Sequence, residues 1–111
     1  MITPKLDVRF FRSDSGNEPV REWLRELTPV DRKIIGEEIK TVQYGWPLGM
    51  PLVRKLDKDL WEIRIHLQNR IARVLFTVSD NVIVLLHGFI KKSQATPKSE
   101  LQLALKRIRN K

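Results

Sequence analysis

The sequence contains no cysteine in its 111 residues. Disulfide bonds, thiolate nucleophiles and thiolate metal sites are therefore excluded. No apolar run approaches the ~20 residues that a membrane span needs, and the N-terminal segment lacks the apolar stretch of a secretory signal. We therefore expect a cytoplasmic protein without a membrane partner.

Acidic side chains are scarce as well. The chain has 13 Asp and Glu residues against 21 Lys and Arg residues, which gives a formal net charge of +8 and a pI near 10.2. No carboxylate cluster of the kind that holds two Mg²⁺ ions stands out in the sequence, so we expect a metal-independent protein without a cofactor. Such an excess of cations in a small domain favours RNA, the ribosome or an acidic protein as the partner.

The spacing of the apolar residues predicts one α+β domain over residues 1–111. Thr28 and Pro29 mark the start of the second of two N-terminal helices, as N-cap and first-turn proline. Thr96 and Pro97 give the same signal for a C-terminal helix. We expect a helical hairpin packed on a curved antiparallel sheet. The predicted strands cover residues 6–12, 52–56, 60–67, 70–78 and 82–90.

Two prolines and a glycine between residues 46 and 51 rule out regular structure and predict a connector between the helices and the strands that follow. Its larger apolar side chains, Trp46, Leu48 and Met50, are expected to pack on the core.

A group of cations and imidazoles is expected on the polar face of the central strands. Arg64 alternates with apolar residues, and a turn near residues 68–69 would bring Arg73 beside it on the next strand. The apolar run over residues 82–86 ends in His87, a glycine, an aromatic residue and two lysines, with His87 expected on the face opposite Leu86. The candidate residues are Arg64, Arg73, His66 and His87 for catalysis, and Lys91, Lys92, Phe89, Arg54 and Lys55 for binding RNA.

These residue types suit the cleavage of RNA, which supplies its own nucleophile in the 2′-OH. Guanidinium groups clamp phosphates, and an aromatic ring stacks on an unpaired base. His66 and His87 are the natural proton movers, because an unperturbed imidazole titrates near pH ~6.5. Ordinary structural roles stay open: Arg64 paired with Glu62, the two histidines solvated or hydrogen-bonded, and the aromatic ring in the core.

Several segments are more distinctive than the composition, namely PVREWLREL, GWPLGMPLVRKL, LWEIRI, RIARVLFTV and LLHGFIKKSQATP. Over residues 8–105 the sequence resembles the phage-derived, HigB-like host-inhibition toxins of the RelE/ParE superfamily. The resemblance implies a RelE-like fold and the toxin of a type II toxin-antitoxin system, held inactive by a helix-turn-helix antitoxin. Arg64 and Arg73 match arginines on two adjacent strands of these toxins, and Lys91 and Lys92 match a lysine pair.

The superfamily has two branches with different targets. The RelE-like branch cleaves mRNA on the ribosome, whereas the ParE-like branch poisons DNA gyrase. We predict from the basic polar face a ribosome-dependent endoribonuclease that inhibits translation. Two alternatives stay open: a gyrase inhibitor, and a non-catalytic module that binds RNA or the ribosome.

Overall fold

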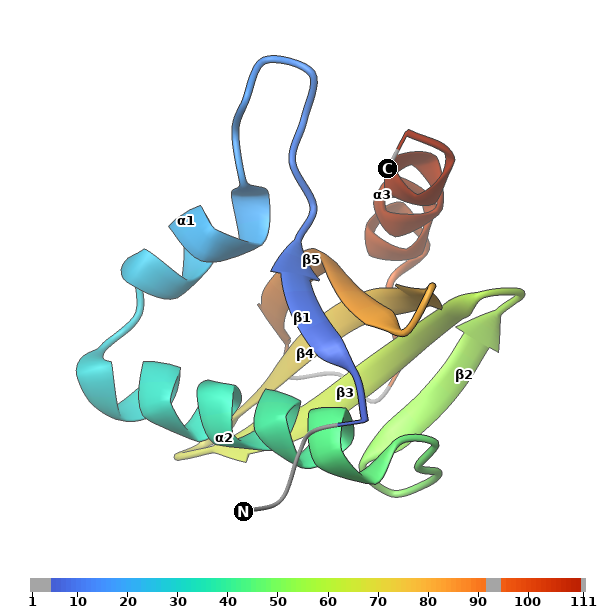
Figure 1. Ribbon diagram of the computed structural model, residues 1–111. Coiled ribbons are helices and arrows are strands. Elements are labelled where there is room, and N and C mark those ends of the chain that lie inside the picture. Colours follow the sequence, from blue (N-terminus) through green and yellow to red (C-terminus); the bar gives the residue numbers. More distant parts are fainter. Residues whose placement is uncertain (1–4, 92–94, 111) are drawn as a thin grey trace.

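The computed structural model describes residues 5–91 and 95–110 (Figure 1). Its helices are α1 (Pro19–Arg25), α2 (Pro29–Gly45) and α3 (Lys98–Arg109). Its strands are β1 (Asp7–Phe10), β2 (Val53–Asp57), β3 (Leu60–Leu67), β4 (Arg70–Ser79) and β5 (Val82–Lys91). The predicted α+β class is confirmed, with two helices before the run of four strands and one after it.

The five strands form one open, mixed sheet in the order β1-β5-β4-β3-β2. Strands β2 to β5 are antiparallel neighbours, as expected from their short connections. The expectation of a wholly antiparallel sheet is wrong at β1, which pairs parallel with β5, Asp7 lying opposite Val82. Because β1 reaches its neighbour through a long crossover rather than a hairpin, the direction of the pair was not fixed by a turn.

Helices cover the two faces of the sheet unequally. Figure 1 shows α1 and α2 on one side and α3 on the other. The larger apolar cluster lies under α1 and α2, and the smaller one lies under α3, where Ala104 is fully buried. The buried positions of α2, Ile35, Ile39 and Val42, recur at the predicted helical spacing. In the described part of the chain, no helix is long and apolar enough to cross a membrane.

The two predicted helix caps have different outcomes. Thr28 caps α2 as expected: its hydroxyl accepts a hydrogen bond from the Asp31 backbone N–H, and Pro29 occupies the first turn. The prediction for Thr96 is wrong, because Pro97 is the N-cap residue of α3 and makes no side-chain cap bond. The Thr96 hydroxyl is instead hydrogen-bonded to side chains of the sheet.

The proline-containing connector packs through part of its predicted set. Trp46 and Leu48 contact the larger apolar cluster, and the Trp46 ring meets the Trp61 ring edge-on with centroids 5.0 Å apart. Met50, expected in the core, is 61% exposed. It lies in the turn that precedes β2.

A β-bulge in β5 changes the predicted faces. Leu75 of β4 lies opposite His87, and the next residue, Phe76, lies opposite Leu85, so that Leu86 is the extra residue. As a result Leu86 and His87 both point toward α3, and the prediction that they lie on opposite faces is wrong. Beyond the bulge, Phe89 also lies on the α3 side.

Candidate functional site

The centre of the candidate site is a pair of arginines on adjacent strands. Arg64 of β3 lies directly opposite Arg73 of β4, as the hairpin prediction required. Both belong to the face that carries α3, and α3 packs mainly on β5 and β4. On the β3 side of this face Glu62 is fully buried, whereas Arg64 is partly exposed and His66 is exposed, so a ligand reaches β3 at Arg64 and His66.

Arg73 is fully buried and already engaged. Its Nη1 lies 3.6 Å from Oε2 of Glu62, which is also fully buried, and donates a hydrogen bond of 3.1 Å to the Thr96 hydroxyl. The Thr96 hydroxyl in turn donates to the same Glu62 oxygen. In this arrangement Arg73 ties the segment before α3 to the sheet.

Arg64 is the arginine that remains available. It is half-buried, and its Nε has no hydrogen-bond partner in the described part of the chain. The pairing with Glu62 that stayed open from the sequence does not occur, because Glu62 is turned to Arg73. Arg64 lines a cavity of about 210 Å³ together with Glu38, Pro51, Leu52 and His66.

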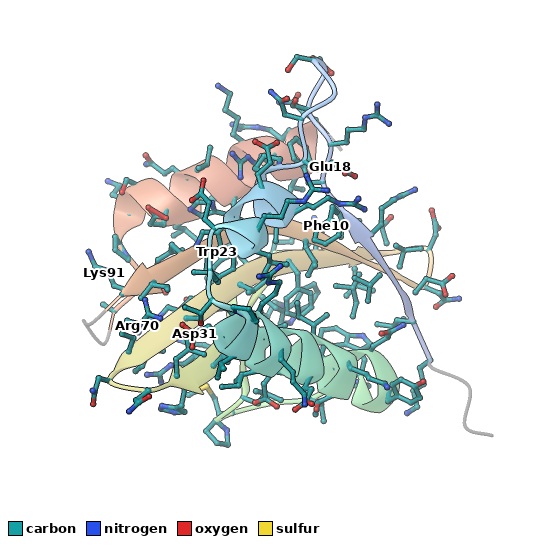
Figure 2. All side chains as sticks on the ribbon, turned by 90° about the vertical axis from the view of Figure 1, so that its left-hand side faces the viewer. Phe10, Glu18, Trp23, Asp31, Arg70 and Lys91 are labelled. Carbon is teal, nitrogen blue, oxygen red and sulfur yellow. The ribbon has the colours of Figure 1, made fainter. Side chains whose placement is uncertain are left out.

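Of the two histidines, His66 is the exposed one. It lines the cavity beside Arg64 and also a second hollow of about 400 Å³ at the turn between β3 and β4, with Arg70 among its other residues. Arg70 is itself paired with Asp31 at the start of α2, and Figure 2 shows these two side chains next to each other. His66 thus stands between two open hollows.

His87 is held by α3. Its Nε2 is paired with Glu100. Nη1 of Arg107 lies 3.4 Å from its Nδ1 and donates a hydrogen bond of 2.7 Å to the Leu86 carbonyl. Burial lowers the pKa of Arg107, and the charge of Glu100 opposes this by raising it. The Phe89 ring stacks on His87 with centroids 5.4 Å apart. The structure therefore groups His87 and Phe89 with the α3 interface rather than with Arg64.

The predicted cations on the other strands lie around this face in different ways. Lys91 ends β5 opposite Ile71, at the same end of the sheet as Arg70 (Figure 2). Lys92 lies outside the described residues. Arg54 is exposed and lies opposite Glu62, hence on its face.

Lys55, the next residue of β2, is on the opposite side of the sheet. Its Nζ lies 5.9 Å from the centre of the Trp61 ring. The predicted set is therefore divided, and of its described members only Arg64, His66 and Arg54 share the β3 and β2 part of this face with exposed or partly exposed side chains.

Sequence reasoning missed several partners that decide these roles. Glu38 of α2 and Leu52 line the same cavity as Arg64 only because the connector folds back against the end of β3. Glu100 and Arg107 lie outside the apolar stripe of α3. Their spacing of seven residues puts them on one side of the helix, and this could have indicated that they share a partner, which is His87. Among the described residues, no three His, Asp or Glu side chains gather closely enough to hold a metal ion.

Comparison with known families gives one match. The family described as Phage derived protein Gp49-like (DUF891) matches residues 22–109, which run from within α1 to the end of α3. The matched region includes Arg64, His66, Arg73 and His87. No curated protein matches the chain.

Proposed function

Since the chain belongs to the family of phage-derived Gp49-like proteins, which is part of the RelE/HigB-like toxin family, we propose that it is the toxin of a type II toxin-antitoxin system. We further propose that it is an endoribonuclease that cleaves mRNA on the ribosome and so inhibits translation. The family supports the toxin class. The chemistry of the site supports the choice of RNA.

One observation carries the choice of RNA: Arg64, half-buried and without a side-chain partner among the described residues, lies beside the exposed His66 in one open cavity. A guanidinium in a partly desolvated position binds a phosphate through two parallel N–H bonds. The +8 charge of the chain adds long-range attraction for the RNA backbone. In this proposal Arg64 holds the scissile phosphate, and Arg54 and Lys91 attract the flanking phosphates.

The proposed reaction needs no metal ion. His66 takes the proton of a ribose 2′-OH, and the oxygen attacks the adjacent phosphorus while Arg64 stabilises the negative charge that develops. The bond from phosphorus to the 5′-oxygen breaks, and that oxygen takes up a proton from a solvent water, while the proton taken by His66 is later released to solvent. The products are a 2′,3′-cyclic phosphate and a free 5′-OH. Arg73 acts by holding Glu62 and Thr96, and His87 by holding α3.

A toxin-like family suggests an antitoxin partner. We propose a helix-turn-helix antitoxin with an acidic contact surface, because an acidic surface complements a chain of charge +8.

The test is expression of the chain without a neighbouring gene, with transcript 5′ ends mapped within minutes of induction. The proposal expects growth arrest and new 5′-OH ends inside translated reading frames. The Arg64→Ala variant should abolish the new ends. The Arg25→Ala variant is the matched control, since Arg25 is an exposed cation of α1 on the other side of the sheet.

Arrest with intact transcripts and broken DNA would replace the nuclease by a gyrase inhibitor. Arrest with neither would indicate a non-catalytic module that occupies the ribosome. An Arg64→Ala variant that cleaves as well as the parent would remove Arg64 from the mechanism.

A further inference from the structure

The cavity beside Arg64 is assembled from three separate parts of the chain. Glu38 comes from α2, Pro51 and Leu52 come from the connector, and Arg64 and His66 come from β3. It forms there because β2 begins opposite Ile63, so that β3 runs on past its neighbour toward α2. Figure 1 shows the connector between α2 and β2 at this corner of the sheet.

The two charged walls of this cavity are not paired with each other. No salt bridge joins Glu38 to Arg64, and in the described part of the chain neither side chain has a hydrogen-bonding side-chain partner. Opposite charges that line one small space without meeting leave room for a molecule that is a donor on one side and an acceptor on the other. The cavity volume of about 210 Å³ corresponds to roughly seven waters at ~30 Å³ each, the scale of one ring system.

We propose that this cavity binds a guanine base of the RNA next to the scissile phosphate, with Glu38 as the residue that selects it; this inference rests on the proposed function. Guanine presents two adjacent N–H donors, N1 and N2, to the Glu38 carboxylate and its O6 acceptor to Arg64. Leu52 and Pro51 supply apolar contact, and His66 supplies a ring at the mouth on which the base stacks.

The same geometry disfavours uracil. Uracil has a single ring N–H between two carbonyl oxygens, so one oxygen faces the Glu38 carboxylate at the place where guanine offers its amino group. An acceptor placed against a carboxylate leaves both groups without a donor, which a partly buried site penalises. Glu38 therefore discriminates by its charge, whereas Arg64 contacts every base that carries a carbonyl.

The first experiment measures binding directly, without cleavage. The purified full-length chain is titrated with 5′-GMP and separately with 5′-UMP, and backbone amide shifts are followed by NMR. Both nucleotides carry the same phosphate, so a difference between them reports the base. We expect GMP to bind at least several-fold more tightly, with the largest shifts at Leu52 and His66. Equal affinities, or shifts confined to other surfaces, would overturn the proposal.

The matched variants are Glu38→Ala and Glu37→Ala. Both remove one carboxylate from adjacent positions of α2, where alanine favours the helix. Glu38→Ala should bring GMP and UMP to the same affinity, and Glu37→Ala should leave their difference unchanged. A Glu38→Ala chain that still prefers GMP would contradict the assignment.

Cleavage mapping then separates this inference from the proposed function. If transcripts are cut next to guanine, and Glu38→Ala keeps the cuts but loses the preference, both proposals stand. Cuts with no base preference would overturn the guanine cavity and leave the nuclease in place. Selective GMP binding that depends on Glu38, in a chain that cuts no transcript, would overturn the nuclease and leave the cavity in place.

Discussion

Gly88 shows how closely one residue of β5 is fitted to α1. A Cβ atom added at this position would lie 2.3 Å from Cε3 of Trp23, well inside van der Waals contact. Figure 2 shows Trp23 directed from α1 toward the sheet. The glycine therefore lets the indole rest on the backbone of β5, and this contact sets the distance between helix and sheet.

We predict that Gly88→Ala destabilises the fold by about 1–3 kcal/mol, because either the indole or the strand must shift. Urea denaturation measures the difference. Gly36→Ala is the control: nothing lies within 4 Å of its added Cβ, and it sits inside α2. That substitution should raise stability by about 0.5–1 kcal/mol. A Gly88→Ala chain as stable as the parent would show that the contact is loose.

The two arginines should respond differently to truncation. Arg73→Ala leaves Glu62 as a buried carboxylate without its cation, and we expect a loss of about 3–5 kcal/mol. Arg64→Ala removes no ion pair to a described residue and should change the free energy of unfolding by less than ~1 kcal/mol while abolishing the proposed cleavage. Thermal unfolding followed beside transcript mapping checks both. Equal destabilisation by the two substitutions would refute this division of roles.

Sequence pattern placed Arg64 and Arg73 side by side because a short hairpin fixes the register of β3 and β4. The pattern does not show which of the two is engaged by Glu62, because that depends on the ion pair of Glu62 with Arg73 and on the hydrogen bond from Thr96, a residue distant in sequence. His87 illustrates the same limit. Its surroundings are set by a bulge and by side chains of α3, neither of which leaves a periodic signal.

At the scale of elements, α3 is attached to the sheet by polar as well as apolar contacts. The Thr96 hydroxyl lies between Arg73 and Glu62 just before the helix, and Arg107 reaches the Leu86 carbonyl from its last turns. The helix is thus fixed at both ends across β5. Its position determines how much of the arginine face stays open.

We predict that Thr96→Val loosens α3 without unfolding the sheet. Valine has nearly the same shape but neither donates to Glu62 nor accepts from Arg73, at an expected cost of about 1–3 kcal/mol. Hydrogen exchange should accelerate in α3 more than in β3 and β4. Ser99→Ala, an exposed position of α3, is the control and should leave exchange unchanged. Uniform acceleration in all elements would contradict a local effect.

Most elements could be predicted from the sequence because their apolar residues repeat at clear periods. The strand predicted over residues 60–67 is β3 as observed, and the helix start predicted at Thr28 and Pro29 is that of α2. The parallel pairing of β1 and the cap of α3 could not be predicted in the same way. The parallel pairing depends on the position of β5, a strand distant in sequence. The cap of α3 depends on the Thr96 hydroxyl, which is hydrogen-bonded to Glu62 instead of to the helix terminus.

For the whole molecule, the +8 charge predicts that the proposed binding to RNA depends on salt. Counterions are released when cations meet phosphates, so affinity falls linearly with salt on a double logarithmic scale. We predict that Arg64→Ala makes the slope for a single-stranded RNA less negative by about one and that Arg25→Ala leaves it unchanged. Filter binding at several salt concentrations measures the slopes. Identical slopes for all three chains would remove the phosphate contact from Arg64.

The pairing of β1 with β5 has a consequence for how the protein is made. Within the described residues β1 pairs with β5 alone, and Leu6 and Phe10 pack in a cluster that also contains Ile83 and Leu85. Contacts between such distant positions form slowly, and β5 is synthesised long after β1. A polypeptide interrupted before β5 lacks the strand with which β1 pairs. The five-stranded sheet can therefore be complete only after Lys91, the end of β5, has been synthesised.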